Sequence, residues 1–250
     1  MAAPRGALPA ATREAVLRSC GATSGLMLLA GTLVKGQPWP TGADTAETAV
    51  LHFGVAVGAA ASVTAARRVL LQKNQAFRDA TDRSNAQVLP PVAQNPWEVA
   101  FVCLAPAAGE EMLFRNALVP AIAWDWRGVV VAGSVFGVLH LTGGRNLTFA
   151  GWAAAVGCAY GAALLVTGDG NVPIVAHAIA NAASAYMWIQ EHPEDVRDYR
   201  REKSMQEMKH ESKVNENVTG GRDEDQTAKD PPFEPLDPQG FQKKKTRRSK

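Results

Sequence analysis

The sequence predicts an all-α fold, a polytopic bundle of about six transmembrane helices followed by a charged, mostly disordered C-terminal tail. Several apolar runs follow one another with short turns between them, and about 20 helical residues cross the hydrocarbon core of a bilayer. Of the 50 charged residues, only 8 lie in residues 97–190, whereas 28 lie in the last 60 positions. An apolar body and a water-soluble tail are therefore expected in one chain.

The N-terminal part is expected to contain a targeting-like segment and two spans. Residues 1–20 are rich in alanine and carry three arginines and one acid, a composition similar to that of organellar targeting segments. The runs Cys20–Val34 and Ala46–Ala66 predict two transmembrane helices, which we assign to residues 21–66. Residues 67–96 are polar and basic, and we interpret them as a linker.

Residues 97–190 are expected to form a four-helix core. Asn95, Pro96 and Glu98 are typical of a helix start, and the apolar segment runs to Ala123. Three further runs follow at Gly128–Gly144, Leu147–Thr167 and 170–190. Residues 191–250 are predicted to be the disordered tail. The protein should therefore be a multi-pass membrane protein, and the sequence leaves plastid and endoplasmic reticulum open as its location.

Charge and cysteine content argue against two classes of protein, those that bind nucleic acid and those built on disulfide bonds. The net charge is +2, and within the tail 14 acids cancel 14 bases, which argues against a nucleic-acid partner. Three cysteines without a C-x-x-C spacing exclude a disulfide scaffold. The expected partners are the lipid bilayer and a membrane-associated or lipidated protein substrate, and the sequence leaves the oligomeric state open.

Ionisable residues within apolar helices are costly, so they need a partner or a purpose. Glu111 and Arg115 are four residues apart, share a helix face and can form an ion pair. Glu110 is five residues from Arg115, so it does not share the helix face of the Glu111–Arg115 ion pair. A carboxylate without such a partner is a candidate general base or acid.

Two further pairs share helix faces in the following spans. Phe136 and His140 are four apart, as are His177 and Asn181. The second pair directs an imidazole and a carboxamide towards one point. Each group alone is compatible with a structural role, but together they predict a catalytic site within the membrane.

The ordered motifs Glu110-Glu111-x-x-x-Arg115, Phe136-x-x-x-His140 and His177-x-x-x-Asn181 resemble the signature of the CPBP family. This family, also called ABI, comprises CAAX-processing and bacteriocin-processing intramembrane proteases. The resemblance covers roughly residues 97–190. The residues Leu141-Thr142-Gly143-Gly144 after His140 depart from the additional histidines usual in the prenyl-processing branch.

The resemblance implies glutamate-dependent hydrolysis of a peptide bond in a membrane-associated substrate, prenylated CAAX-type proteins being one class. Glu110 and His140 would hold and activate the attacking water. His177 and Asn181 would stabilise the oxyanion, an effect that contributes several kcal/mol in other enzymes. The supporting residues would be Glu111, Arg115 and Phe136.

Two other hypotheses stay open. We expect no cofactor, but in a zinc-dependent version of the protease Glu110, His140 and His177 would be the metal ligands. Alternatively, the protein could be a non-proteolytic scaffold of the same fold that binds and stabilises a partner. Replacement of Glu110 by glutamine distinguishes the scaffold from the protease, because a scaffold keeps partner binding.

Overall fold

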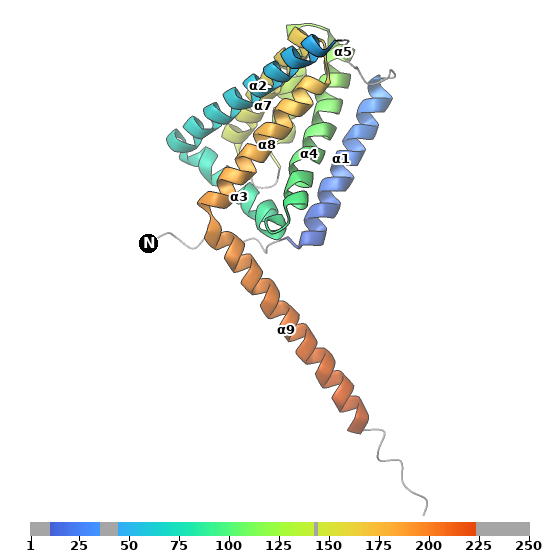
Figure 1. Cartoon of the computed structure of the whole chain (residues 1–250), viewed down its shortest axis with the longest axis vertical. Helices are drawn as coiled ribbons and strands as arrows, with labels where there is room; N and C mark the ends of the chain where they lie inside the picture. The colour runs from blue at the N-terminus through green and yellow to red at the C-terminus, as the bar shows by residue number, and fades with distance from the viewer. Residues whose placement is uncertain (1–10, 36–44, 143–144, 224–250) are drawn as a thin grey trace, which may run out of the picture. The chain divides into compact units, whose positions relative to one another are not determined.

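The computed structural model describes residues 11–35, 45–142 and 145–223, and within them it contains helices and no strand. The predicted all-α fold is therefore confirmed (Figure 1). In chain order the helices are α1 (Arg13–Lys35), α2 (Ala46–Lys73), α3 (Gln75–Val92), α4 (Pro96–Glu111), the π-helix η1 (Met112–Leu118), α5 (Val119–Ile122), α6 (Trp126–Leu139), α7 (Leu147–Thr167), α8 (Asn171–Glu191) and α9 (Pro193–Asp223).

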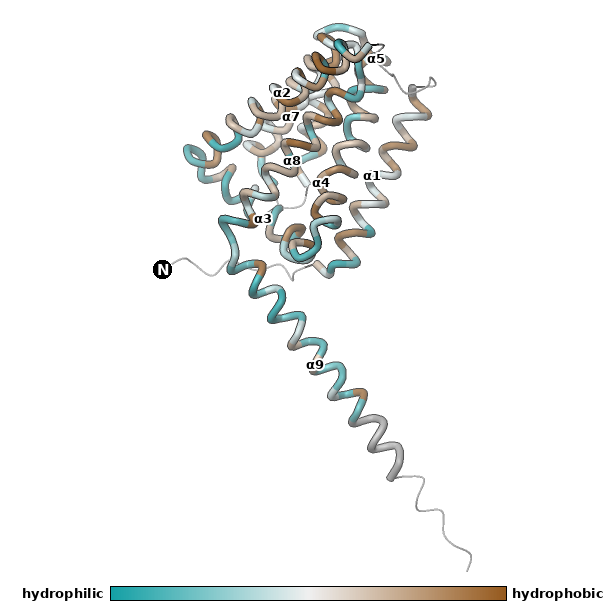
Figure 2. The backbone as a smooth tube through the Cα atoms, in the orientation of Figure 1, coloured by the Kyte–Doolittle hydropathy of each residue, from teal (hydrophilic) through white to brown (hydrophobic). Residues whose placement is uncertain are grey.

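Four described helices are long and apolar enough to cross a membrane, namely α1, α2, α7 and α8, so the protein is a multi-pass integral membrane protein (Figure 2). About six spans were predicted, and the other two predicted spans do not meet these criteria as single helices among the described residues. Helix α6 has 14 residues, about 21 Å at 1.5 Å per residue, which is shorter than the hydrocarbon core. The expected third span is divided into α4, η1 and α5 and carries the ionisable residues Glu110, Glu111 and Arg115.

Local signals explain where the core helices begin and end. The Asn95 side chain accepts a hydrogen bond from Trp97 N at 3.0 Å, so α4 begins where the sequence indicates. The Asn146 side chain caps α7 in the same way, accepting from Phe149 N at 3.0 Å. Gly168 ends α7 with φ of +67°, a left-handed conformation that glycine adopts without steric cost.

The segment 67–96 is helical rather than a linker. Helix α2 continues to Lys73, and α3 begins one residue after Asn74, whose side chain accepts a hydrogen bond from Phe77 N at 2.9 Å. Phe77 and Ala80 are fully buried, and α3 packs against α2, α7 and α8. The polar composition of the segment is that of an amphipathic helix with one buried face.

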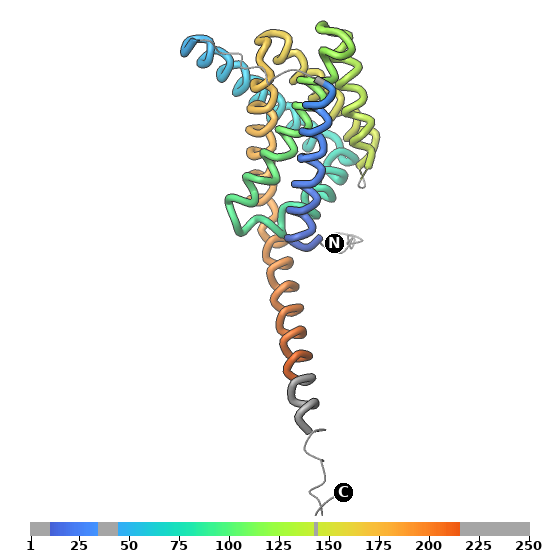
Figure 3. The backbone as a smooth tube through the Cα atoms, turned by 90° about the vertical axis from the view of Figure 1, so that its right-hand side faces the viewer, coloured from blue at the N-terminus to red at the C-terminus, as the bar shows by residue number. Residues whose placement is uncertain are grey.

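Close helix contacts hold the core together (Figure 3). A Cβ added at Gly133 of α6 would lie 2.8 Å from Cys158 Sγ of α7, and one added at Gly161 of α7 would lie 2.7 Å from Val129 of α6. Helix α1 approaches α4 equally closely, because a Cβ at Gly109 would lie 2.8 Å from the Ser24 carbonyl oxygen. Small residues therefore let these backbones meet.

The structure describes only part of each end of the chain. Within the tail, residues 193–223 are helical, and Lys203 and Glu207 form one of the i,i+4 ion pairs that support a charged helix. The rest of the predicted disordered tail, 224–250, lies outside the described residues. Residues 1–10 of the targeting-like segment also lie outside them, and α1 already begins at Arg13.

Candidate active site

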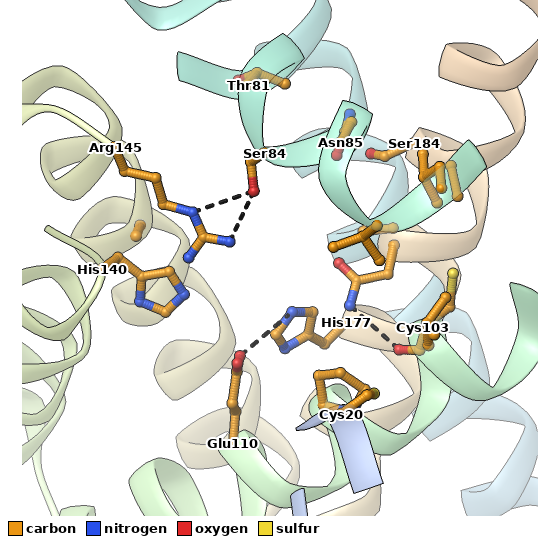
Figure 4. Close-up of a pocket in the computed structure, with 18 of the residues that line it drawn as sticks. Cys20, Thr81, Ser84, Asn85, Cys103, Glu110, His140, Arg145, His177 and Ser184 are labelled. Carbon is orange, nitrogen blue, oxygen red and sulfur yellow. Dashed lines mark hydrogen bonds and ion pairs between the residues drawn. The ribbon is translucent and has the colours of Figure 1, made fainter. Parts of the chain in front are cut away.

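A cavity of about 590 Å³ lies among the core helices, and residues of α1, α2, α3, α4, α6, α7 and α8 line it (Figure 4). The four predicted catalytic residues all line it, and Phe136 lines it as well: Glu110, Phe136, His140, His177 and Asn181. Glu111 and Arg115 are fully buried behind this lining. The structure thus brings three separated sequence motifs into one place.

The two adjacent glutamates lie in different surroundings. The Glu111 side chain is 0 % exposed, and its Oε2 lies 3.1 Å from Arg115 Nε, so the ion pair expected from the spacing is present. The Glu110 side chain is 17 % exposed and reaches the cavity, where its Oε2 lies 3.9 Å from His177 Nε2. Glu111 is therefore held by the protein, whereas Glu110 is accessible to a ligand.

His177 connects the two carboxylates. Its Nδ1 lies 2.7 Å from Glu111 Oε1, and because a carboxylate oxygen can only accept, Nδ1 must be the donor. This hydrogen bond fixes the ring and leaves Nε2 to face Glu110. The ring of Tyr160 packs at a centroid distance of 5.1 Å and limits the orientations that the imidazole can adopt.

His140 presents its Nε2 in a comparable way. Its Nδ1 lies 2.7 Å from the Phe136 carbonyl oxygen, which can only accept, so Nδ1 carries a proton. His140 follows the last residue of α6 and lies outside the four candidate spans. Burial lowers the pKa of its imidazole from the usual value because desolvation disfavours the charged form, and the charge of Glu110 partly opposes this effect. The neutral ring keeps a lone pair on Nε2.

Phe136 links the histidine to the buried ion pair. The Arg115 guanidinium carbon lies 4.4 Å from the centroid of the Phe136 ring, and that centroid lies 4.3 Å from the His140 ring. Arg115 Nε also donates to the Gly157 carbonyl oxygen at 3.3 Å. Among the described residues, Nη1 and Nη2 of Arg115 have no hydrogen-bond partner, and the Phe136 ring gives the guanidinium a cation–π contact in addition to its ion pair with Glu111.

Asn181 is held against α4. Its amide nitrogen donates to the Cys103 carbonyl oxygen at 3.2 Å, and its side chain lies one helical turn from His177 on the cavity side of α8. This bond uses one amide hydrogen and leaves the other available to a ligand.

A zinc-dependent protease would need several ligating side chains close together around Glu110. Within the part of the chain that the structure describes, no group of three or more His, Cys, Asp and Glu side chains is arranged to hold a metal ion. Glu110, His140 and His177 therefore do not form a ready ligand set in this geometry. The expectation of no cofactor stays a prediction that metal removal can test.

Some cavity residues were not predicted. Ser84 of α3 and Arg145, between α6 and α7, line the wall opposite Glu110 (Figure 4). Tyr160 is fully buried beside His177. Arg145 stands next to a charge-free run in the sequence, which is a visible signal, but a loop position alone did not indicate that its side chain faces the cavity.

Comparison with protein families gives one match. Residues 92–183 match the family described as type II CAAX prenyl endopeptidase Rce1-like. Neither a search of curated proteins nor a search of solved structures finds a match to this chain. The matched segment begins at the end of α3, extends into α8 and contains every predicted site residue. Residues 92–183 of this chain are therefore similar to the Rce1-like type II CAAX prenyl endopeptidases, which are the CPBP family.

Proposed function

We propose that this protein is an intramembrane endopeptidase that hydrolyses a peptide bond near the C-terminus of a prenylated, CAAX-type substrate. The observation that carries the proposal is an accessible carboxylate beside two fixed imidazoles in one cavity, Glu110 with His140 and His177. The family match supports the substrate class.

In the proposed reaction, Glu110 and His140 hold the attacking water. Glu110 accepts a proton from this water while the water oxygen bonds to the scissile carbonyl carbon. The carbonyl oxygen becomes an oxyanion, which accepts hydrogen bonds from Asn181 and from His177 when Nε2 carries a proton. Glu110 then transfers its proton to the leaving nitrogen as the C–N bond breaks, which returns the carboxylate to its starting state.

The buried residues support this chemistry by holding the imidazole of His177. Glu111 binds Nδ1 of His177, and Arg115 balances the charge of Glu111 at 3.1 Å. The imidazole can donate to the oxyanion only in the form that carries a hydrogen on Nε2. In this account Glu111 and Arg115 position a catalytic group and do not touch the substrate.

The test is cleavage of a prenylated C-a-a-X peptide and of a mixed pool of membrane peptides by the purified protein in liposomes. The proposal predicts cleavage of the prenylated peptide by the wild type and none by Glu110→Gln. If the folded wild type cleaves nothing, and the wild type and Glu110→Gln bind a partner equally well, the result would instead support the scaffold hypothesis.

A further inference from the structure

Arg145 is a cation in the wall of the cavity that the proposed reaction does not use. It lies in the segment between α6 and α7, one residue before the cap of α7, and its side chain reaches into the cavity beside His140 and across from Glu110 (Figure 4). Ser84 Oγ on α3 accepts hydrogen bonds from its Nε at 3.3 Å and its Nη2 at 3.0 Å. The guanidinium carbon also lies 4.8 Å from the centroid of the Phe149 ring.

The charge of Arg145 is not balanced by a close carboxylate. Within the described residues, Arg13, Arg115 and Arg127 each form an ion pair with a carboxylate, whereas Arg145 forms none and is attracted to Glu110 only at longer range. A guanidinium is charged at every accessible pH, and withdrawing a charge from water is costly unless the charge is paired. Ser84 and Phe149 orient the group without neutralising it, so the site is prepared for an anion.

The chemistry of a C-a-a-X substrate supplies such an anion. This sequence lies at the C-terminus of its protein, so its last residue carries a free carboxylate. A cut within the four residues leaves at most three of them beyond the scissile bond, a length of about 10 Å when extended. A planar guanidinium binds a carboxylate through two parallel hydrogen bonds.

Resting on the proposed function, we propose that Arg145 binds the free C-terminal carboxylate of the substrate and is a specificity residue of this enzyme. The cavity then has a positive end at Arg145 and a negative one at Glu110. This polarity places the terminal carboxylate away from Glu110 and brings the preceding peptide bonds towards it. The same contact selects chain ends over internal peptide bonds.

The test compares two prenylated peptides that differ only at the C-terminus, one with a free carboxylate and one with a carboxamide. For the wild type, kcat/KM for the carboxylate should exceed that for the carboxamide by about tenfold to a hundredfold, the usual effect of losing a charged hydrogen bond. Arg145→Gln should lower kcat/KM for the carboxylate to the carboxamide level and leave the carboxamide nearly unchanged. Ser84→Ala should reduce the ratio partly, because it removes the hydrogen bonds that orient the guanidinium.

Arg127→Gln is the matched control, since Arg127 is an exposed arginine paired with Asp125 outside the cavity, and it should keep the wild-type ratio. Equal cleavage of both peptides by the wild type, or an equal loss on both in Arg145→Gln, would overturn the proposal. If the wild type cleaves neither peptide, the proposed function fails. Binding of the two peptides to the wild type and to Arg145→Gln then tests the carboxylate contact by itself, and equal binding of both peptides to the wild type would overturn it.

Discussion

At the scale of single residues, Glu110 and Glu111 show how two neighbours take different roles. Glu111 is enclosed with Arg115 and His177, whereas Glu110 opens to the cavity. Removing one partner of a buried ion pair leaves a buried charge without compensation, which typically costs about 3–5 kcal/mol. No comparable cost is expected at Glu110, which faces the cavity and whose Oε2 lies 3.9 Å from His177 Nε2.

We therefore expect Glu110→Gln to abolish cleavage without changing the thermal unfolding midpoint, and Glu111→Gln to lower both. Unfolding in detergent and cleavage in liposomes measure the two effects on the same preparations. The adjacent variants serve as controls for each other because each replaces one carboxylate by an amide of the same size. Equal destabilisation by both would contradict the assignment of Glu110 as the accessible carboxylate.

The pH dependence of kcat/KM tests the role of His140. Below its pKa, His140 Nε2 carries a proton and cannot accept a hydrogen bond from the attacking water, so activity should fall as the pH falls through that value. Because burial lowers this pKa, the fall should occur below pH 6.5, the usual value for histidine. The role would be contradicted if kcat/KM of the wild type falls already at or above pH 6.5 and the residual activity of His140→Gln shows the same fall.

At the scale of helices, glycines on α6 and α7 determine how closely the site residues meet. A Cβ at Gly157 would lie 2.8 Å from Arg115 Nη2 and 3.0 Å from Gly133 Cα. The absence of a side chain at this position makes room for the buried guanidinium. Gly54 and Gly58 on α2 are four residues apart, as are Gly157 and Gly161 on α7. A Cβ at Gly54 or Gly58, however, would meet nothing within 4 Å.

Gly157→Ala should therefore destabilise the protein by about 1–3 kcal/mol, as overpacking of a close core does, and reduce cleavage by displacing Arg115. Gly151→Ala on the same helix is the matched control, because a Cβ there meets nothing within 4 Å. Unfolding midpoints of the two variants provide the comparison. A Gly157→Ala variant as stable and active as Gly151→Ala would show that α6 and α7 are less closely packed than described.

The helices also show what local sequence can and cannot predict. The apolar run Leu147–Thr167 coincides with α7, because hydropathy and caps are properties of neighbouring residues. The polar and basic composition of residues 67–96 predicts a linker, because it gives no sign that residues such as Phe77 are buried. This segment also forms the part of the cavity wall that carries Ser84. That role depends on contacts with residues more than 60 positions away in the sequence.

At the scale of the whole molecule, the motifs predicted the identity of the site residues, and the fold determines which of them are in contact. The spacing of Glu111 and Arg115 predicted their ion pair because i and i+4 positions always share a helix face. The hydrogen bond from His177 to Glu111 joins residues 66 positions apart, so no local pattern could have predicted it. The same holds for Arg145, whose place in the cavity wall follows from α3 lying against α7.

The central claim is that Glu110 activates water for peptide hydrolysis in this cavity. The most direct measurement is cleavage of a prenylated C-a-a-X peptide in liposomes by the wild type and by Glu110→Gln, each with and without a zinc chelator. The account predicts cleavage by the wild type that survives chelation and is absent in the variant. Equal cleavage by the Glu110→Gln variant would contradict the role of Glu110, and loss of wild-type cleavage on chelation would show that a metal ion takes part.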